Sequence, residues 1–128
     1  MRVKNEDLLE IDGTRAELDM TSTFNSKPVW LGHICNYSIQ LVFTGTPAGS
    51  FKLQASNDIG DPTAAGEANK YASVTTWTDI EGSSEVISAP GNHMWNVENA
   101  GYNWVRLVWT LTSSTGTLTT ARAYVKGF

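Results

Sequence analysis

The sequence is poor in the residues that build catalytic and metal sites. Its 128 residues include two histidines and a single cysteine. One cysteine cannot form a disulfide within the chain, which is typical of a reducing compartment. Cys35 lies beside Ile34 in an apolar run, which favours a buried, unreactive thiol. His33 and His93 match no zinc-ligand spacing. The pattern therefore predicts no cofactor and no enzyme.

Charge is sparse as well. Charged residues make up 17% of the chain, and the net charge is −4. The nine lysines and arginines are scattered, so we expect neither a nucleic-acid partner nor a membrane-surface partner. No apolar run reaches the roughly 18 residues of a membrane helix, and no apolar segment typical of a signal peptide follows residues 1–7. These absences favour folding in the cytoplasm.

Alternating strands are the clearest positive signal. Between positions 35 and 43 every second residue is apolar, which is the period of a half-buried strand. A turn at 45–49 joins this strand to a second one at 50–56, and the pair predicts a hairpin. Further strands are expected at 15–22, 74–80, 85–89, 93–97, 102–112 and 117–126. Seven to eight short strands without a helix predict one all-β domain, an antiparallel β-sandwich of jelly-roll type.

The N-terminal residues differ from this pattern. Residues 1–14 mix charges with Leu8, Leu9 and Ile11. We interpret 1–14 as an arm or edge segment, and 15–128 as the β-sandwich domain. The three apolar side chains are candidates for contact with a neighbouring subunit; the alternative is a frayed terminus.

The stretch 57–73 has no periodicity. Loops of this length in small domains are usually functional or mobile. It carries Asp58, Asp61 and Glu67, whose carboxylates are calcium candidates. Their spacing matches no known calcium loop, and a solvated acidic loop is the alternative that we prefer.

Five tryptophans are the remaining candidates for binding. Trp109 shares one strand face with Val105 and Leu107, so we expect it in the core. Trp77 and Trp104 are candidates for a surface that binds a protein or a sugar ring, the alternative being that they too pack in the core.

Two resemblances meet at these residues. Residues 51–58 (FKLQASND) with 77–80 (WTDI) resemble a segment of discoidin-like carbohydrate-binding sandwiches. In that family the tryptophan follows within a few residues, whereas an insertion of about eighteen residues separates Asp58 from Trp77 here. This likeness implies a glycan as partner.

The second resemblance covers most of the chain. Residues 37–58, 95–97 and 100–110 look like segments of small virion proteins of double-stranded DNA phages, in particular capsid decoration or cement proteins. That likeness implies a structural protein that assembles in the host cytoplasm and resides in the virion. Its partners would be capsid or other virion proteins and further copies of itself, as a symmetric homo-oligomer. The alternative function is a carbohydrate-binding module on a tail or spike.

Overall fold

The strand with the strongest alternation folds as predicted. The computed structural model describes residues 2–32 and 36–127, and in it β7 (Asn36–Thr44) has Tyr37, Ile39, Leu41 and Phe43 buried on one face. The side chains between them face outward. Period-two alternation places every second side chain on the core side of a pleated strand. His33 and Cys35, for which a structural histidine and an inert thiol were expected, lie outside the described residues.

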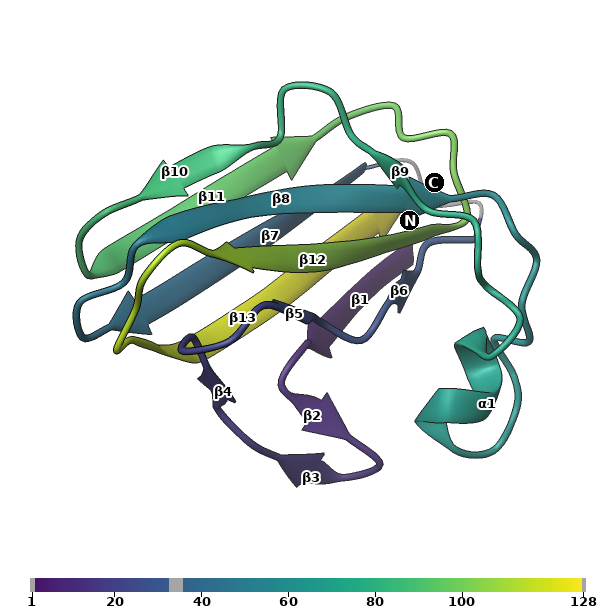
Figure 1. Cartoon of the computed structure of the whole chain (residues 1–128). Coiled ribbons are helices and arrows are strands. Elements are labelled where there is room, and N and C mark those ends of the chain that lie inside the picture. The colour runs from purple at the N-terminus through teal and green to yellow at the C-terminus, as the bar shows by residue number, and fades with distance from the viewer. Residues whose placement is uncertain (1, 33–35, 128) are drawn as a thin grey trace.

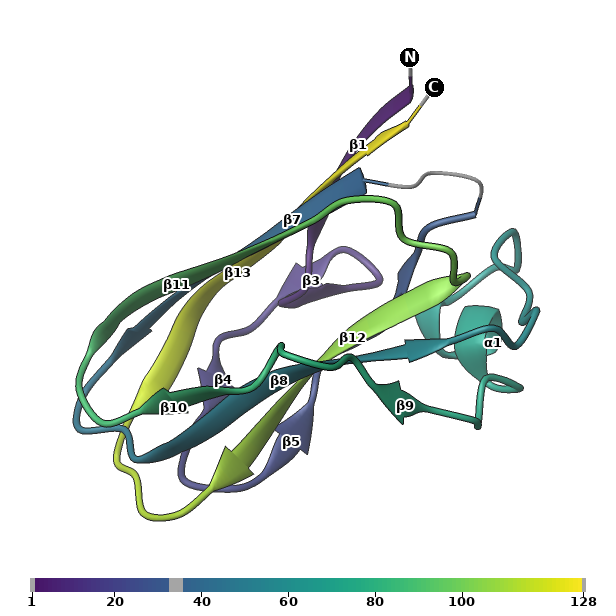
Figure 2. The same cartoon turned by 90° about the horizontal axis from the view of Figure 1, so that it is seen from above.

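Two antiparallel sheets pack face to face (Figures 1 and 2). The first sheet has the order β1-β13-β7-β11, with the short strand β4 also paired to β13. Its members are β1 (Arg2–Asp7), β13 (Thr117–Gly127), β7, β11 (Gly91–Val97) and β4 (Leu18–Asp19).

The second sheet has the order β10-β8-β12-β5, with β6 paired to β12 and β9 paired to β8. Its members are β10 (Glu85–Ile87), β8 (Gly49–Ser56), β12 (Trp104–Leu111), β5 (Phe24–Asn25), β6 (Val29–Trp30) and β9 (Thr78–Asp79). A separate hairpin joins β2 (Glu10–Ile11) to β3 (Thr14–Arg15).

The chain crosses from one sheet to the other at most connections, which gives the strand order of a jelly roll. The predicted antiparallel β-sandwich is therefore confirmed. The core lies between the sheets and is closed by aromatic pairs, among them Phe51 against Trp109 at 4.6 Å between ring centroids. Trp109 is fully buried, as expected.

One pairing and several boundaries differ from the prediction. β7 and β8 do not form a hairpin, because the turn between them carries the chain from the first sheet to the second. Residues 15–22 form no continuous core strand. They supply Arg15 to β3 and Leu18–Asp19 as β4, and Met20 is the one residue among them that is fully buried. The expected strand 74–80 shrinks to the two residues of β9. The non-periodic stretch contains a helix of five residues, α1 (Glu67–Tyr71). No helix in the described chain is long and apolar enough to cross a membrane.

The N-terminal segment is an edge strand of the first sheet. β1 pairs with β13 along all six of its residues. Leu8 and Leu9 then turn inward and belong to the buried core. The expectation that these two leucines contact a neighbouring subunit is therefore wrong, because their side chains are covered by the sandwich itself. Ile11, at the hairpin, remains 48% exposed.

Candidate functional site

The outer face of the second sheet is covered at one end by residues 57–77, here called the insertion. Asn103 Nδ2 donates to the Asn57 carbonyl at 3.0 Å, and Trp104 Nε1 donates to the Ile59 carbonyl at 3.3 Å. The main chain of Asp61 bonds to that of Lys70 at 2.8 Å, which closes the segment on itself. The insertion is therefore a packed part of the fold.

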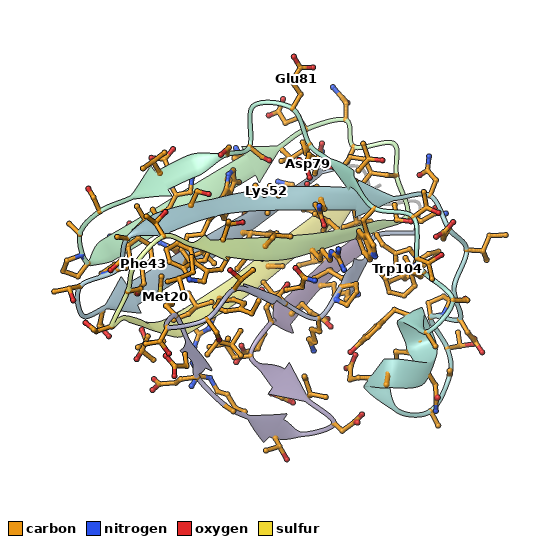
Figure 3. The ribbon with its side chains drawn as sticks, viewed as in Figure 1. Met20, Phe43, Lys52, Asp79, Glu81 and Trp104 are labelled. Atoms are coloured by element: carbon orange, nitrogen blue, oxygen red, sulfur yellow. The ribbon has the colours of Figure 1, made fainter. Side chains whose placement is uncertain are left out.

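Trp104 lies beneath this insertion and is 1% exposed. Its ring meets Trp30 at 4.9 Å and Tyr71 at 6.5 Å between centroids. A Cβ at Gly60 would lie 2.8 Å from the Trp104 ring. Figure 3 shows Trp104 at the end of the sandwich that faces α1. Trp104 is thus buried between the sheet and the insertion, and its prediction as a surface binding residue is wrong.

Trp77 and Ile11, both binding candidates from the sequence, line one hollow of about 260 Å³, here called the Trp77 hollow. The hairpin β2–β3 supplies Ile11 from one side, and the end of the insertion supplies Trp77 from the other. The hollow combines apolar and aromatic side chains with polar ones, and its two cations are Lys27 and Arg106. Its lining also includes Asn25, Ser26, Lys27, Pro28, Tyr71, Val74 and Arg106.

Arg106 is held in place by a chain of polar contacts across β12, β8 and β9. Its guanidinium lies 4.3 Å from the centroid of the Trp77 ring, and its Nε and Nη2 donate to Gln54 Oε1 at 2.9 and 2.7 Å. Gln54 Nε2 in turn donates to Asp79 Oδ1 at 2.8 Å, and Lys52 bonds the other Asp79 oxygen at 3.0 Å. Arg106 is therefore oriented before any partner arrives.

The charge of Arg106 has no carboxylate partner in the part of the chain that the structure describes. Five other cations each have a carboxylate oxygen within 4 Å, whereas Arg106 is half-buried and bonds only a neutral amide. Burial lowers the pKa of Arg106 from its usual value. Guanidinium groups nevertheless stay charged in proteins and bind carboxylates in pairs of hydrogen bonds. The Trp77 hollow can therefore take an apolar group next to a carboxylate or hydroxyl.

The three calcium candidates do not converge. Asp58 Oδ2 accepts from the backbone of Thr75 and Thr76, both at 2.9 Å, while Glu67 contacts Lys27 and Lys70. Asp61 is exposed, and its side chain contacts Thr63. No three acidic, histidine or cysteine side chains gather anywhere in the described ranges. These carboxylates stabilise the insertion and its junctions instead.

A second hollow, here called the Tyr102 hollow, has a volume of about 520 Å³ between the insertion and the loop before β12. Tyr102 is fixed there by a 2.5 Å hydrogen bond between its hydroxyl and that of Tyr37. Asp58 and Asp79 line the same hollow. Backbone donors from Thr76 and Thr75 lower the pKa of Asp58, and Gln54 and Lys52 lower that of Asp79. Both carboxylates are therefore ionised hydrogen-bond acceptors near neutral pH.

Lys27 links the insertion to the N-terminal edge strand. Its Nζ lies 3.4 Å from Glu6 of β1 and 3.5 Å from Glu67 of α1, and its side chain is only 5% exposed. The turn of the β2–β3 hairpin adds a second link, since Asp12 Oδ1 accepts from the Glu67 backbone at 2.9 Å. The hairpin and the insertion, which form the two walls of the Trp77 hollow, are thus both linked to the ion-pair cluster of Lys27, Glu6 and Glu67.

Sequence reasoning missed Arg106, Tyr102 and Lys27. For Arg106 a signal was present, because both faces of the expected strand 102–112 carry bulky residues, which indicates a covered outer face. For Tyr102 and Lys27 no local pattern marks the residue, since each gains its role from partners more than 20 positions away.

Comparison with known proteins yields structural neighbours alone. No family model and no curated protein sequence matches the chain. The SPBc2 prophage-derived protein YomS superposes with a TM-score of 0.52 at 16% identity, over 97% of this chain and 92% of that one. Chitosan-binding module 1 from a chitosanase/glucanase of Paenibacillus sp. IK-5 gives 0.48 at 19% identity, over 98% and 94%. The coat protein of Tobacco streak virus gives 0.44 at 8% identity, over 97% and 85%. At these identities the YomS likeness establishes the shared fold.

Proposed function

We propose that this chain is a non-enzymatic structural protein of a phage particle, which decorates or cements the capsid through protein–protein contacts at the Trp77 hollow. The observation that carries the proposal is the pre-oriented, half-buried Arg106 beside Trp77, without a carboxylate partner among the described residues. Tryptophan and arginine are the residues that most often dominate the binding energy of protein interfaces. The fold shared with a prophage-derived protein is compatible with this role.

The partner in this proposal presents an apolar side chain next to an acidic one. The apolar group enters between Ile11 and Trp77, and the acidic group bonds the free N–H donors of Arg106. Binding by Trp77 and Arg106 is strong because the indole ring and the guanidinium lose little side-chain freedom when the partner docks. The Gln54–Asp79 contacts already hold the guanidinium in its orientation.

Replacing Trp77 by alanine is expected to weaken binding to capsids by at least about tenfold, because removing an interface anchor costs 1.4 kcal/mol or more. The measurement is co-sedimentation of the purified protein with phage particles that lack it, as a function of protein concentration. Tyr124→Ala is the matched control, since Tyr124 is an exposed aromatic residue on the outer face of the opposite sheet. Equal binding of wild type and Trp77→Ala, with both folded, would contradict the proposal.

A carbohydrate-binding function is the second candidate, and the Tyr102 hollow favours it. Sugar rings stack on aromatic side chains, and ionised carboxylates accept hydrogen bonds from their hydroxyls. The hollow places Tyr102 together with Asp58 and Asp79 in a volume of about 520 Å³. The glycan site proposed here therefore differs from the one expected from the sequence, because neither Trp77 nor Trp104 lines the Tyr102 hollow.

In this second candidate, Tyr102→Ala is expected to abolish binding in titration calorimetry against oligosaccharides, whereas Trp77→Ala leaves it intact. Tyr102→Phe separates the ring from the hydroxyl: it keeps the stacking surface and loses only the hydrogen bond to Tyr37. The glycan function is rejected when the wild-type protein binds none of a broad panel of neutral and acidic oligosaccharides at millimolar concentration.

A further inference from the structure

The edges of the two sheets are protected unequally. An exposed edge strand presents unpaired backbone groups, and folded proteins block such edges with charges, short strands or bulges. The edge strand β1 carries charges at four of its six positions: Arg2, Lys4, Glu6 and Asp7. The edges of the second sheet are short, because β10 has three residues and β5, β6 and β9 have two each.

The remaining edge strand, β11, has none of these protections. It is seven residues long, contains no proline or Asp, Glu, Lys or Arg, and pairs with β7 in unbroken register. In the described chain, no backbone hydrogen bond links β11 to any element besides β7. Figure 2 looks onto this margin of the first sheet, where no other segment of the ribbon crosses over β11.

We propose that β11 is a dimerisation edge, at which a second copy of this chain adds its own β11 in antiparallel orientation. A twofold axis through Met94 then joins the first sheets of the two copies into one continuous sheet. The outward row of β11 is symmetric about this point: Asn92 and Asn96 flank Met94, which is 52% exposed. Each Asn92 comes to lie opposite Asn96 of the second copy, and the two Met94 side chains cover each other.

Charge distribution favours a second copy as the occupant. The chain has a net charge of −4, so two copies repel each other over most approaches. The outward row of β11 has no acidic or basic side chain to place opposite itself, since His93 lies on the other face beside Trp95. The asparagine amides of this row are at once donors and acceptors. A twofold contact requires such self-complementarity, because the same patch serves on both sides. This inference is independent of the Trp77 hollow, which lies on the other sheet.

The test is the molar mass of the full chain by sedimentation equilibrium, over about 1–200 µM protein. We expect the wild type to approach twice its 14.0 kDa mass. Met94→Lys places two like charges opposite each other and is expected to raise the dimer dissociation constant by at least about tenfold. Val86→Lys is the matched control: it changes a residue that is 78% exposed on β10 in the same way and leaves the dimer intact.

Hydrogen exchange of the wild type gives a second readout that needs no variant. The β11 amides that point away from β7 are expected to gain protection as protein concentration rises, while those of β1 do not. A monomeric wild type over the whole concentration range overturns the proposal. So does a dimer whose β11 amides stay unprotected, or one that a folded Met94→Lys variant forms as tightly as the wild type.

Discussion

Replacing Trp104 by alanine is expected to lower the free energy of unfolding by about 3–5 kcal/mol, the range for deleting a large buried aromatic side chain. The change removes the ring on which Trp30, Tyr71 and Gly60 pack. It also leaves the Ile59 carbonyl without its indole donor. The insertion then loses much of its attachment to the sheet. The measurement is urea unfolding followed by circular dichroism, analysed by linear extrapolation.

Trp77→Ala is the control for this experiment. Trp77 is only half-buried and lies at the rim of a hollow, so we expect it to cost about 1 kcal/mol, close to the average for a point substitution. The two variants thus distinguish an effect on stability from an effect on binding, because Trp104 supports the fold and Trp77 supports the proposed contact. Equal and small losses for both variants would show that the insertion does not depend on Trp104.

The sandwich could be predicted because its long strands carry their own pattern. In β7 and β8 each apolar residue is separated by one polar or exposed residue, and a slip by one position would turn the whole core face to water. Such local information suffices for the strands but not for their partners, because β7 and β8 lie in opposite sheets and do not form the hairpin that the turn between them suggested. It does not define short bridges such as β4 and β9, where two residues pair only because distant segments bring them together.

The candidate site could be predicted only in part, and the reason is the insertion. Whether Trp104 is core or surface depends on what covers the outer face of β12, and the covering segment has no periodicity that would reveal it. Leu8 and Leu9 could not be placed from the sequence for the same reason. Two apolar residues among charges are compatible with an arm that contacts another subunit and with a segment that packs into the core. Ile11 and Trp77 were singled out separately, but their meeting in one hollow required the tertiary structure.

Lys27 provides the second large effect, because it is a buried charge on which two elements depend. Its ammonium lies between the carboxylates of Glu6 and Glu67, whose side chains are themselves mostly buried. Removing one partner of a buried ion pair leaves the others desolvated and uncompensated. A surface pair behaves differently: Lys52 and Asp79 are closer, at 3.0 Å, yet the Asp79 side chain is 59% exposed. Solvent screening leaves such a contact worth less than about 1 kcal/mol.

Lys27→Met is therefore expected to lower the free energy of unfolding by about 3 kcal/mol, whereas Lys52→Met lowers it by less than about 1 kcal/mol. Methionine keeps most of the lysine volume, so the loss reports the charge and not a cavity. Adding Glu6→Gln and Glu67→Gln to Lys27→Met is expected to recover part of that stability, because the triple variant buries no unpaired charge. Urea unfolding of the four proteins measures these differences. If Lys27→Met and Lys52→Met cost the same, then burial does not set the strength of the Lys27 cluster. The insertion is then held to the rest of the fold mainly by the Asp12 contact at the β2–β3 hairpin and by packing on Trp104.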